Sequence, residues 1–328
     1  MLWPFATLAE GLRIATLHAE LIRKGPGLLL RDIRRGADDQ LNALKQINSA
    51  VRPDILFLSK VDFDAELKTA KALGAFLDYP HIFTLPPNSM VPTTLDLDGD
   101  GESADRQTWV RYAGEGAMLL LSHYPISLRF HLNDLLWRDF AGARLPIRKD
   151  GTPFPSEAAH KVQKLVGQGF WVVDVLTPDE PVTLVVFHNQ TPAFDGHEDV
   201  NGLRNRDQLA LLDAVMQGAF GDFPNRRFVL MGNANLDPER GQGDRNAIAT
   251  LLADPRIQDP KPKSVLGSYA SAFWDRPGPM RVSYILPSRD WDVQRAEVFW
   301  PQTGPLRKAA EQASRHRMAW ADIRPRQE

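Results

Sequence analysis

The segment 191–207 gathers, in one short stretch, the residue types that could do chemistry. It reads TPAFDGHEDVNGLRNRD and directly follows an apolar run, 182–187, that ends in His188. A buried run that ends in histidine and opens into a polar loop of Asp, Asn and Arg is typical of an active site, because rigid elements position functional loops. The candidate residues within this loop are Asp195, Asp199, Asn201, Arg204, Asn205 and Asp207.

Short apolar runs that alternate with helix-like segments must position this loop. Eight runs are apolar and bounded by Gly, Pro or charged residues, which predicts buried strands at 12–17, 55–58, 117–121, 170–176, 182–187, 227–231, 281–286 and 293–299. Apolar residues at helical spacing predict helices at 38–51, 65–76, 204–218 and 245–252. The alternation predicts an α/β protein whose sheets are covered by helices.

The composition is that of an ordinary globular protein. The 328 residues are 43% hydrophobic and 24% charged, which is ample for one large core. We expect a single domain, 1–328, with a long irregular insertion at about 127–168, where the periodicity is weak. Such a connection inside a compact domain is usually functional or mobile.

Charge and residue counts exclude several classes of protein. The net charge of −2 argues against a strongly basic nucleic-acid surface. The absence of cysteine excludes disulfides, thiolate zinc sites and cysteine nucleophiles. No apolar run approaches the roughly 18 residues of a membrane span, and residues 1–10 lack the pattern of a signal peptide. A cytoplasmic protein is the default expectation, while an exported form and the oligomeric state stay open.

Six segments in chain order, each at a predicted strand end, resemble the endonuclease/exonuclease/phosphatase family, the deoxyribonuclease-I-like metal-dependent phosphoesterases. They are LRIATLH at 12–18, PDILFLSKVD at 53–62, GEGAMLLLSHYPI at 114–126, the segment 185–207, FVLMGNANLDP at 228–238, and the pair 281–288 and 313–316. The resemblance implies two packed mixed β-sheets flanked by helices, a four-layer α/β sandwich. It also implies phosphoester hydrolysis with Mg²⁺ or Mn²⁺ held by carboxylates.

Three residues match the catalytic residues of the family. His188 stands at the strand-end histidine, Asn235 at the Asn of the Gly-Asp-x-Asn motif, and His316 at the last histidine. His18 stands where the family carries an asparagine after its first strand.

Four carboxylates of the family are replaced. Lys60 stands at the metal-binding glutamate, and Asn233, Ser283 and Arg315 stand at three aspartates. The charge at these positions goes from −4 to +2, a change of +6. A pocket of this kind should repel a divalent cation, and its cations could pair with a phosphate instead.

The replacements predict a degenerate member of the family. We expect impaired or absent phosphoesterase activity, no metal at the main site, and binding of a small anionic or phosphorylated ligand at the old cleft. One alternative is an active phosphodiesterase or phosphatase with a rearranged site, in which three histidines could hold Zn²⁺ or Mn²⁺. Its residues would be His18, His188, His316, Asn235, Asp199 and Asp207. Another alternative is an interaction protein that keeps only the scaffold.

A separate acidic loop could bind calcium. Asp96, Asp98 and Asp100 alternate and are followed by Gly101, which matches the start of a calcium loop. The twelfth position is Gln107 instead of glutamate. The pattern therefore leaves open a calcium site and a solvated surface loop.

Overall fold

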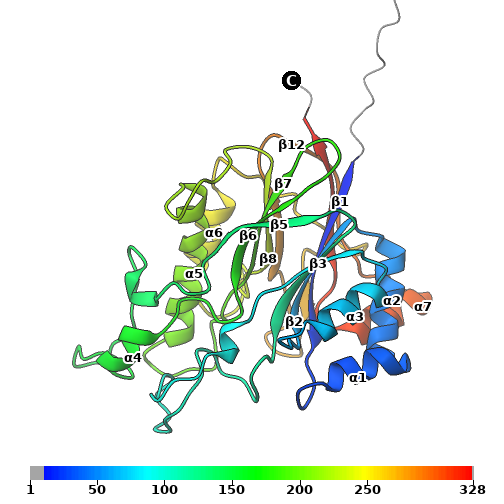
Figure 1. The fold of residues 1–328 in the computed structure, drawn as a ribbon. Coiled ribbons are helices and arrows are strands. Elements are labelled where there is room, and N and C mark those ends of the chain that lie inside the picture. The colour runs from blue at the N-terminus through cyan, green and yellow to red at the C-terminus, as the bar shows by residue number, and fades with distance from the viewer. Residues whose placement is uncertain (1–10, 327–328) are drawn as a thin grey trace, which may run out of the picture.

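Two mixed β-sheets pack face to face, with helices on both outer faces (Figure 1). The computed structural model describes residues 11–326. The predicted fold class, a four-layer α/β sandwich, is confirmed. Residues 1–10, for which no signal peptide is predicted, lie outside the described residues. Within 11–326, no helix combines the length and the apolar character that crossing a membrane requires.

The first sheet has six strands and carries the N-terminal strand near its centre. Its order is β12 (Trp291–Val298), β13 (Ala319–Pro325), β1 (Leu12–Leu21), β2 (Ile55–Val61), β4 (Ala117–Ser122) and β3 (His81–Phe83). β1 pairs parallel with β2 and antiparallel with β13. Apolar side chains on the outer face pack against four helices: α1 (Leu28–Arg35), α2 (Asp39–Val51), α3 (Lys68–Phe76) and α7 (Gly304–Ala313).

The second sheet has five strands. Its order is β11 (Ser283–Pro287), β8 (Phe228–Asn233), β7 (Val182–His188), β6 (Phe170–Val175) and β5 (Ile126–His131). Its outer face is covered mainly by α5 (Val200–Met216) and α6 (Arg245–Leu252). A short helix, α4 (Glu157–Val162), and a two-stranded hairpin of β9 (Ala272–Phe273) and β10 (Pro279–Met280) complete the fold.

Alternation along the strands builds the core between the sheets. Successive side chains of a strand point to opposite faces, so every second residue of β1, β2, β7 and β8 faces the other sheet. Ile14, Phe57, Val186 and Met231 are among these side chains, and all are fully buried. The same alternation determines which polar residues stand at the end of this core.

Three expectations about the elements need correction. The stretch 127–168 is not irregular throughout, because its first residues belong to β5, which pairs with β6. The predicted helix 204–218 begins earlier, at Val200. The strand β13 and the helices α1 and α7 were not predicted, because β13 interrupts its apolar residues with Asp322 and Arg324 and the two helices have only 8 and 10 residues.

Candidate active site

The core between the sheets ends in a polar layer, which we define as His18, Ser59, His188, Asn233 and Ser283. Each side chain lies on a different strand, on the face that also carries apolar residues of the core between the sheets. Strand pairing places His18 beside Ser59 in the first sheet. It places Asn233 between His188 and Ser283 in the second. The two sheets therefore bring five residues that are distant in sequence to the same end of the core between the sheets.

His18 is the centre of this layer. Its Nδ1 lies 3.0 Å from the Asn233 amide nitrogen, 3.2 Å from the Ser59 hydroxyl and 3.1 Å from His188 Nε2. Because an amide nitrogen can only donate, Nδ1 of His18 accepts from Asn233. An aspartate at position 233 would instead favour a protonated His18. The replacement of that aspartate therefore favours a neutral imidazole.

His316 closes the site from the C-terminal side. Its ring lies 4.2 Å from the His18 ring, and the Trp274 ring meets it edge-on at 5.3 Å. Its Nδ1 and the hydroxyl of Ser283 are buried, and neither has a hydrogen-bond partner among residues 11–326. Buried polar atoms without partners are rare, so these two are available to a ligand or an ordered water.

The three imidazoles are neutral near pH 7. Burial lowers the pKa of His18 and of His188 well below the usual range, and the nearby Lys60 ammonium lowers both further. Burial also lowers the pKa of His316 to about 4. Neutral imidazoles can donate or accept a hydrogen bond at the site without adding charge.

Lys60 brings a positive charge to this layer. It follows Ser59 at an irregularity of β2, with φ of 59°, and its side chain runs along Gly116. A Cβ on Gly116 would stand 3.0 Å from Lys60 Cδ and 3.3 Å from Nζ, so a side chain there would crowd the lysine. Among the described residues, the ammonium has neither a hydrogen-bond partner nor an ion-pair partner. Burial lowers the pKa of Lys60, and Glu115 opposes this effect.

Arg315 does not point a free charge into the cleft. Its guanidinium is bound by the carboxylate of Glu20 through Nε, at 2.9 Å, and through Nη2. The Arg315 side chain is 67% exposed and that of Glu20 only 17%. Burial alone would raise the pKa of Glu20, but the hydrogen bonds from Arg315 lower it on balance. The pair is therefore charged and neutral overall.

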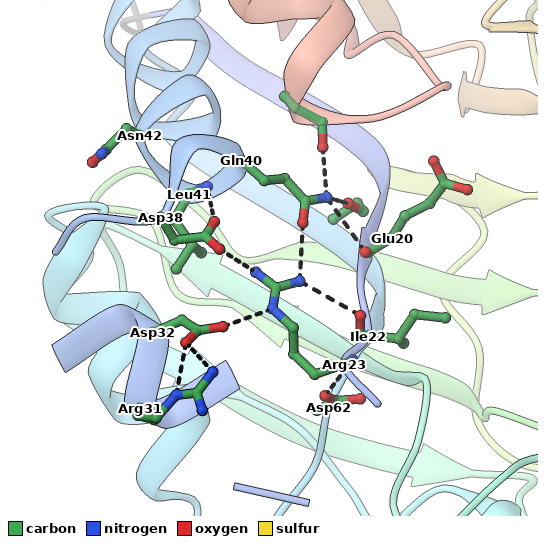
Figure 2. Close-up of polar contacts among 12 residues, drawn as sticks. Glu20, Ile22, Arg23, Arg31, Asp32, Asp38, Gln40, Leu41, Asn42 and Asp62 are labelled. Carbon is green, nitrogen blue, oxygen red and sulfur yellow. Dashed lines mark hydrogen bonds and ion pairs between the residues drawn. The ribbon is translucent and has the colours of Figure 1, made fainter. Parts of the chain in front are cut away.

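A partly buried network fixes the end of β1, from which His18 and Glu20 project. Figure 2 shows the Arg23 guanidinium held by Asp32, Asp38 and the Gln40 side chain. Gln40 in turn donates to the backbone oxygens of residues 19 and 20 and, at 2.9 Å, of residue 313. This network ties the end of β1 to α2 and to the end of α7.

Most of the predicted loop residues serve the scaffold instead of the site. Asn201, Arg204, Asn205 and Asp207 lie on α5 and not in a loop. Asp207 is fully buried and accepts from the Trp137 indole and the backbone of residue 144, each at 2.7 Å. The Asp207 carboxylate is therefore unavailable to a substrate. This corrects the expectation that Asp207 belongs to the alternative, rearranged active site.

The remaining loop contacts are also local. Asn205 donates to the backbone oxygens of residues 190 and 234. Asp195 accepts from the backbone of Asn201, and the Asp199 side chain packs against Gly202 at the start of α5. The loop therefore positions α5 and the end of β8, with Asp199 outside the polar layer.

Asn235 lies beside the layer. It has φ of 52°, donates at 2.7 Å to the backbone oxygen of residue 189, and accepts at 3.1 Å from the Asn233 amide. His18, Lys60 and Asn235 are all partly exposed.

A divalent cation does not fit this donor set. The family is metal-dependent, and Mg²⁺ takes oxygen ligands that include one or two carboxylates. The carboxylates nearest to the site, Glu20 and Glu115, are engaged by Arg315 and Arg111. The three histidines do not form a metal cluster either. Metal ions are held by His, Cys, Asp and Glu side chains. Within residues 11–326, the only three such side chains whose ligand atoms all lie within 4.8 Å of one another are Asp96, Asp98 and Asp105.

That acidic group lies on a surface loop and differs from the predicted one. Asp105 takes part in place of Asp100, whose carboxylate accepts from the backbone of Glu102 at 2.8 Å. Calcium binding at this loop stays a prediction.

Sequence reasoning missed three residues of the site. Ser59 could have been found by counting two residues on from Phe57 along a predicted strand. Glu20 and Gln168 gave no signal, because Glu20 meets Arg315 across 295 residues and Gln168 contacts His188 from outside any strand.

Comparisons with known proteins agree with the fold. The model of the endonuclease/exonuclease/phosphatase family matches residues 29–316. No curated protein matches the chain.

Solved structures share the fold at low sequence identity. An endonuclease/exonuclease/phosphatase from Beutenbergia cavernae is 18% identical, with a TM-score of 0.53 over 96% of this chain and 72% of its own. Sphingomyelinase C from Streptomyces griseocarneus is 16% identical, with a TM-score of 0.55 over 95% and 99%. A mannosyl-6-phosphatase from Bacteroides thetaiotaomicron is 13% identical, with a TM-score of 0.54 over 95% and 99%. The family match spans most of the chain, and the chain belongs to the endonuclease/exonuclease/phosphatase family.

Proposed function

We propose that this protein binds a small anionic or phosphorylated ligand at Lys60 without a divalent cation, and that metal-dependent phosphoester hydrolysis is lost or severely reduced. One observation carries the proposal. The Lys60 ammonium stands beside a polar layer that contains no carboxylate, and no described residue pairs with it. An unpaired, partly buried ammonium favours an anion and repels a metal ion.

The groups around Lys60 suit an oxyanion. His18 and His188 are neutral, and the Ser59 and Ser283 hydroxyls belong to the same layer. Hydroxyl and imidazole N–H groups can donate to phosphate oxygens, while the ammonium balances the charge. The buried Nδ1 of His316 and the Ser283 hydroxyl gain from such a ligand, because neither has a partner in the described protein.

A second candidate function is metal-free hydrolysis at the rearranged site. The chain of contacts from Ser59 through His18 to His188 favours it, because it links a hydroxyl to two imidazoles that titrate below neutral pH. Against it stands the lack of an orienting carboxylate, which usually fixes the tautomer of a catalytic histidine.

Hydrolysis assays separate these functions. A chromogenic phosphodiester and a chromogenic phosphomonoester are offered with EDTA, Mg²⁺, Mn²⁺, Ca²⁺ or Zn²⁺ in turn, beside the His188→Ala variant. We expect no turnover above the variant under any condition. Metal-dependent turnover that His188→Ala abolishes would overturn the proposal, and turnover in EDTA would favour the second candidate.

A further inference from the structure

Two of the cations near the site, Lys60 and Arg315, replace carboxylates of the family, and only one of these two is available. Lys60 has no partner among residues 11–326, whereas the guanidinium of Arg315 is taken by Glu20. Arg315 is therefore charged but already compensated at the rim of the polar layer.

Glu20 is held firmly in this position. Its Oε2 accepts from the Ser314 hydroxyl at 3.0 Å and from the Arg315 backbone at 2.9 Å. Its own backbone has φ of 52°, a conformation that costs a non-glycine residue about 1–2 kcal/mol and that Gln40 supports from α2 (Figure 2). These contacts hold the Glu20 carboxylate in one position beside the polar layer.

Glu20 lowers the positive charge beside the polar layer by one unit. Lys60 keeps its charge, and the three imidazoles are neutral near pH 7. Arg317, next to His316, is buried and donates to the backbone oxygens of residues 314 and 316, while Glu115, the carboxylate that acts on Lys60, is balanced by Arg111 at 2.6 Å. With Arg315 balanced by Glu20, an anion of lower charge is better matched than one that needs a further free cation.

We propose that Glu20 is a specificity-determining residue, which neutralises Arg315 and so makes the site select singly charged oxyanions over doubly charged ones. Phosphodiesters belong to the favoured class and phosphomonoesters at alkaline pH to the disfavoured one. This inference rests on the proposed anion binding at Lys60 and names the ligand class of that site.

Calorimetric titration with two small probes tests it. Dimethyl phosphate and methyl phosphate are compared at pH 8 in EDTA, where the first carries one charge and the second two. The wild type should prefer dimethyl phosphate. Glu20→Gln frees Arg315 and should shift the ratio of the two affinities about tenfold toward methyl phosphate.

Two control variants isolate the charge of Glu20. Glu20→Asp keeps the negative charge and should keep the wild-type ratio. Glu157→Gln removes an exposed carboxylate that is paired with Lys161 on α4, and it should leave both affinities unchanged. Circular dichroism checks that each variant is folded.

The outcomes separate this inference from the proposed function. If neither probe binds the wild type, anion binding itself fails and the inference falls with it. If the wild type binds methyl phosphate as tightly as dimethyl phosphate, the inference is overturned while the proposed function stands. An unchanged ratio in folded Glu20→Gln overturns it in the same way. The wild-type preference decides the matter if Glu20→Gln does not fold.

Discussion

Replacing Lys60 with methionine should make the protein more stable and less able to bind anions. Methionine keeps the length of the side chain along Gly116 and removes its charge. Burial lowers the pKa of Lys60, so the folded state penalises the ammonium. Removing this partly buried ammonium, which has no partner among residues 11–326, should raise the free energy of unfolding by about 1–3 kcal/mol at pH 7.

The pH dependence of this gain has a fixed sign. The folded-state pKa lies below that of the unfolded chain, so the penalty is complete at low pH, where both states carry the charge. It fades as the pH rises through the folded pKa toward about 10.5, the value for an exposed lysine. The advantage of Lys60→Met over wild type should therefore be present at pH 7 and shrink in alkaline solution.

The loss of binding can be estimated from the same contact. A hydrogen bond to a charged group contributes about 1.5–3 kcal/mol, so the dissociation constant for dimethyl phosphate should rise roughly 10- to 150-fold. Urea denaturation measures the first effect and calorimetric titration in EDTA the second. Lys45→Met is the matched control. Lys45 lies on the helix α2, outside the polar layer, and is 43% exposed.

The test depends on measuring both the stability and the anion affinity of Lys60→Met. If Lys60 only supported the fold, its replacement would make the protein less stable and leave the affinity for anions unchanged. A folded Lys60→Met protein that is less stable than wild type, with dimethyl phosphate bound as before, would refute the reasoning. Equal effects in Lys45→Met would show that only net charge matters.

Three further predictions follow from the same contacts. Lys60→Glu combined with Asn233→Asp should give measurable Mg²⁺ binding by calorimetry, since it supplies two carboxylates; no heat of binding would contradict the account. Because burial lowers the pKa of His316 to about 4, the unfolded chain takes up a proton first, and the free energy of unfolding should fall as the pH drops from about 6.5 to 4. An NMR titration midpoint of His316 above 6 would oppose this. Arg23→Met removes the arginine that joins Asp32 and Asp38, although Asp32 keeps Arg31, and should cost about 1.5–3 kcal/mol in urea denaturation. The exposed Arg324→Met should cost less than about 1 kcal/mol, and equal losses would argue against the network.

Much of the fold follows from local pattern. The interior strands β2, β4, β7 and β8 are largely apolar runs, since both of their faces are covered, and all eight predicted strands form at or near the expected positions. β5 escaped prediction because it lies at the edge of its sheet and most of its side chains are exposed. Burial on both faces made the apolar strands easy to predict, but β13, which is also interior, escaped because it carries Asp322 and Arg324.

The site was predictable only where one strand determines it. His188 and Asn233 end apolar runs, and His18 follows another, so their place at a sheet edge could be read locally. The pairing of Arg315 with Glu20 could not, because it depends on how α7 and the end of β1 meet. Arg315 therefore looked like a free anion-binding cation in the sequence and is a compensated one in the fold.

The most direct test of the account is the affinity of the wild type for dimethyl phosphate, measured in EDTA and again in excess Mg²⁺. In the proposed function, Lys60 supplies the charge that a metal ion would otherwise supply, so we expect binding in EDTA with a dissociation constant that Mg²⁺ leaves unchanged. Binding that appears only with Mg²⁺, or that strengthens tenfold or more with it, would show that a metal still occupies this site and would contradict the account.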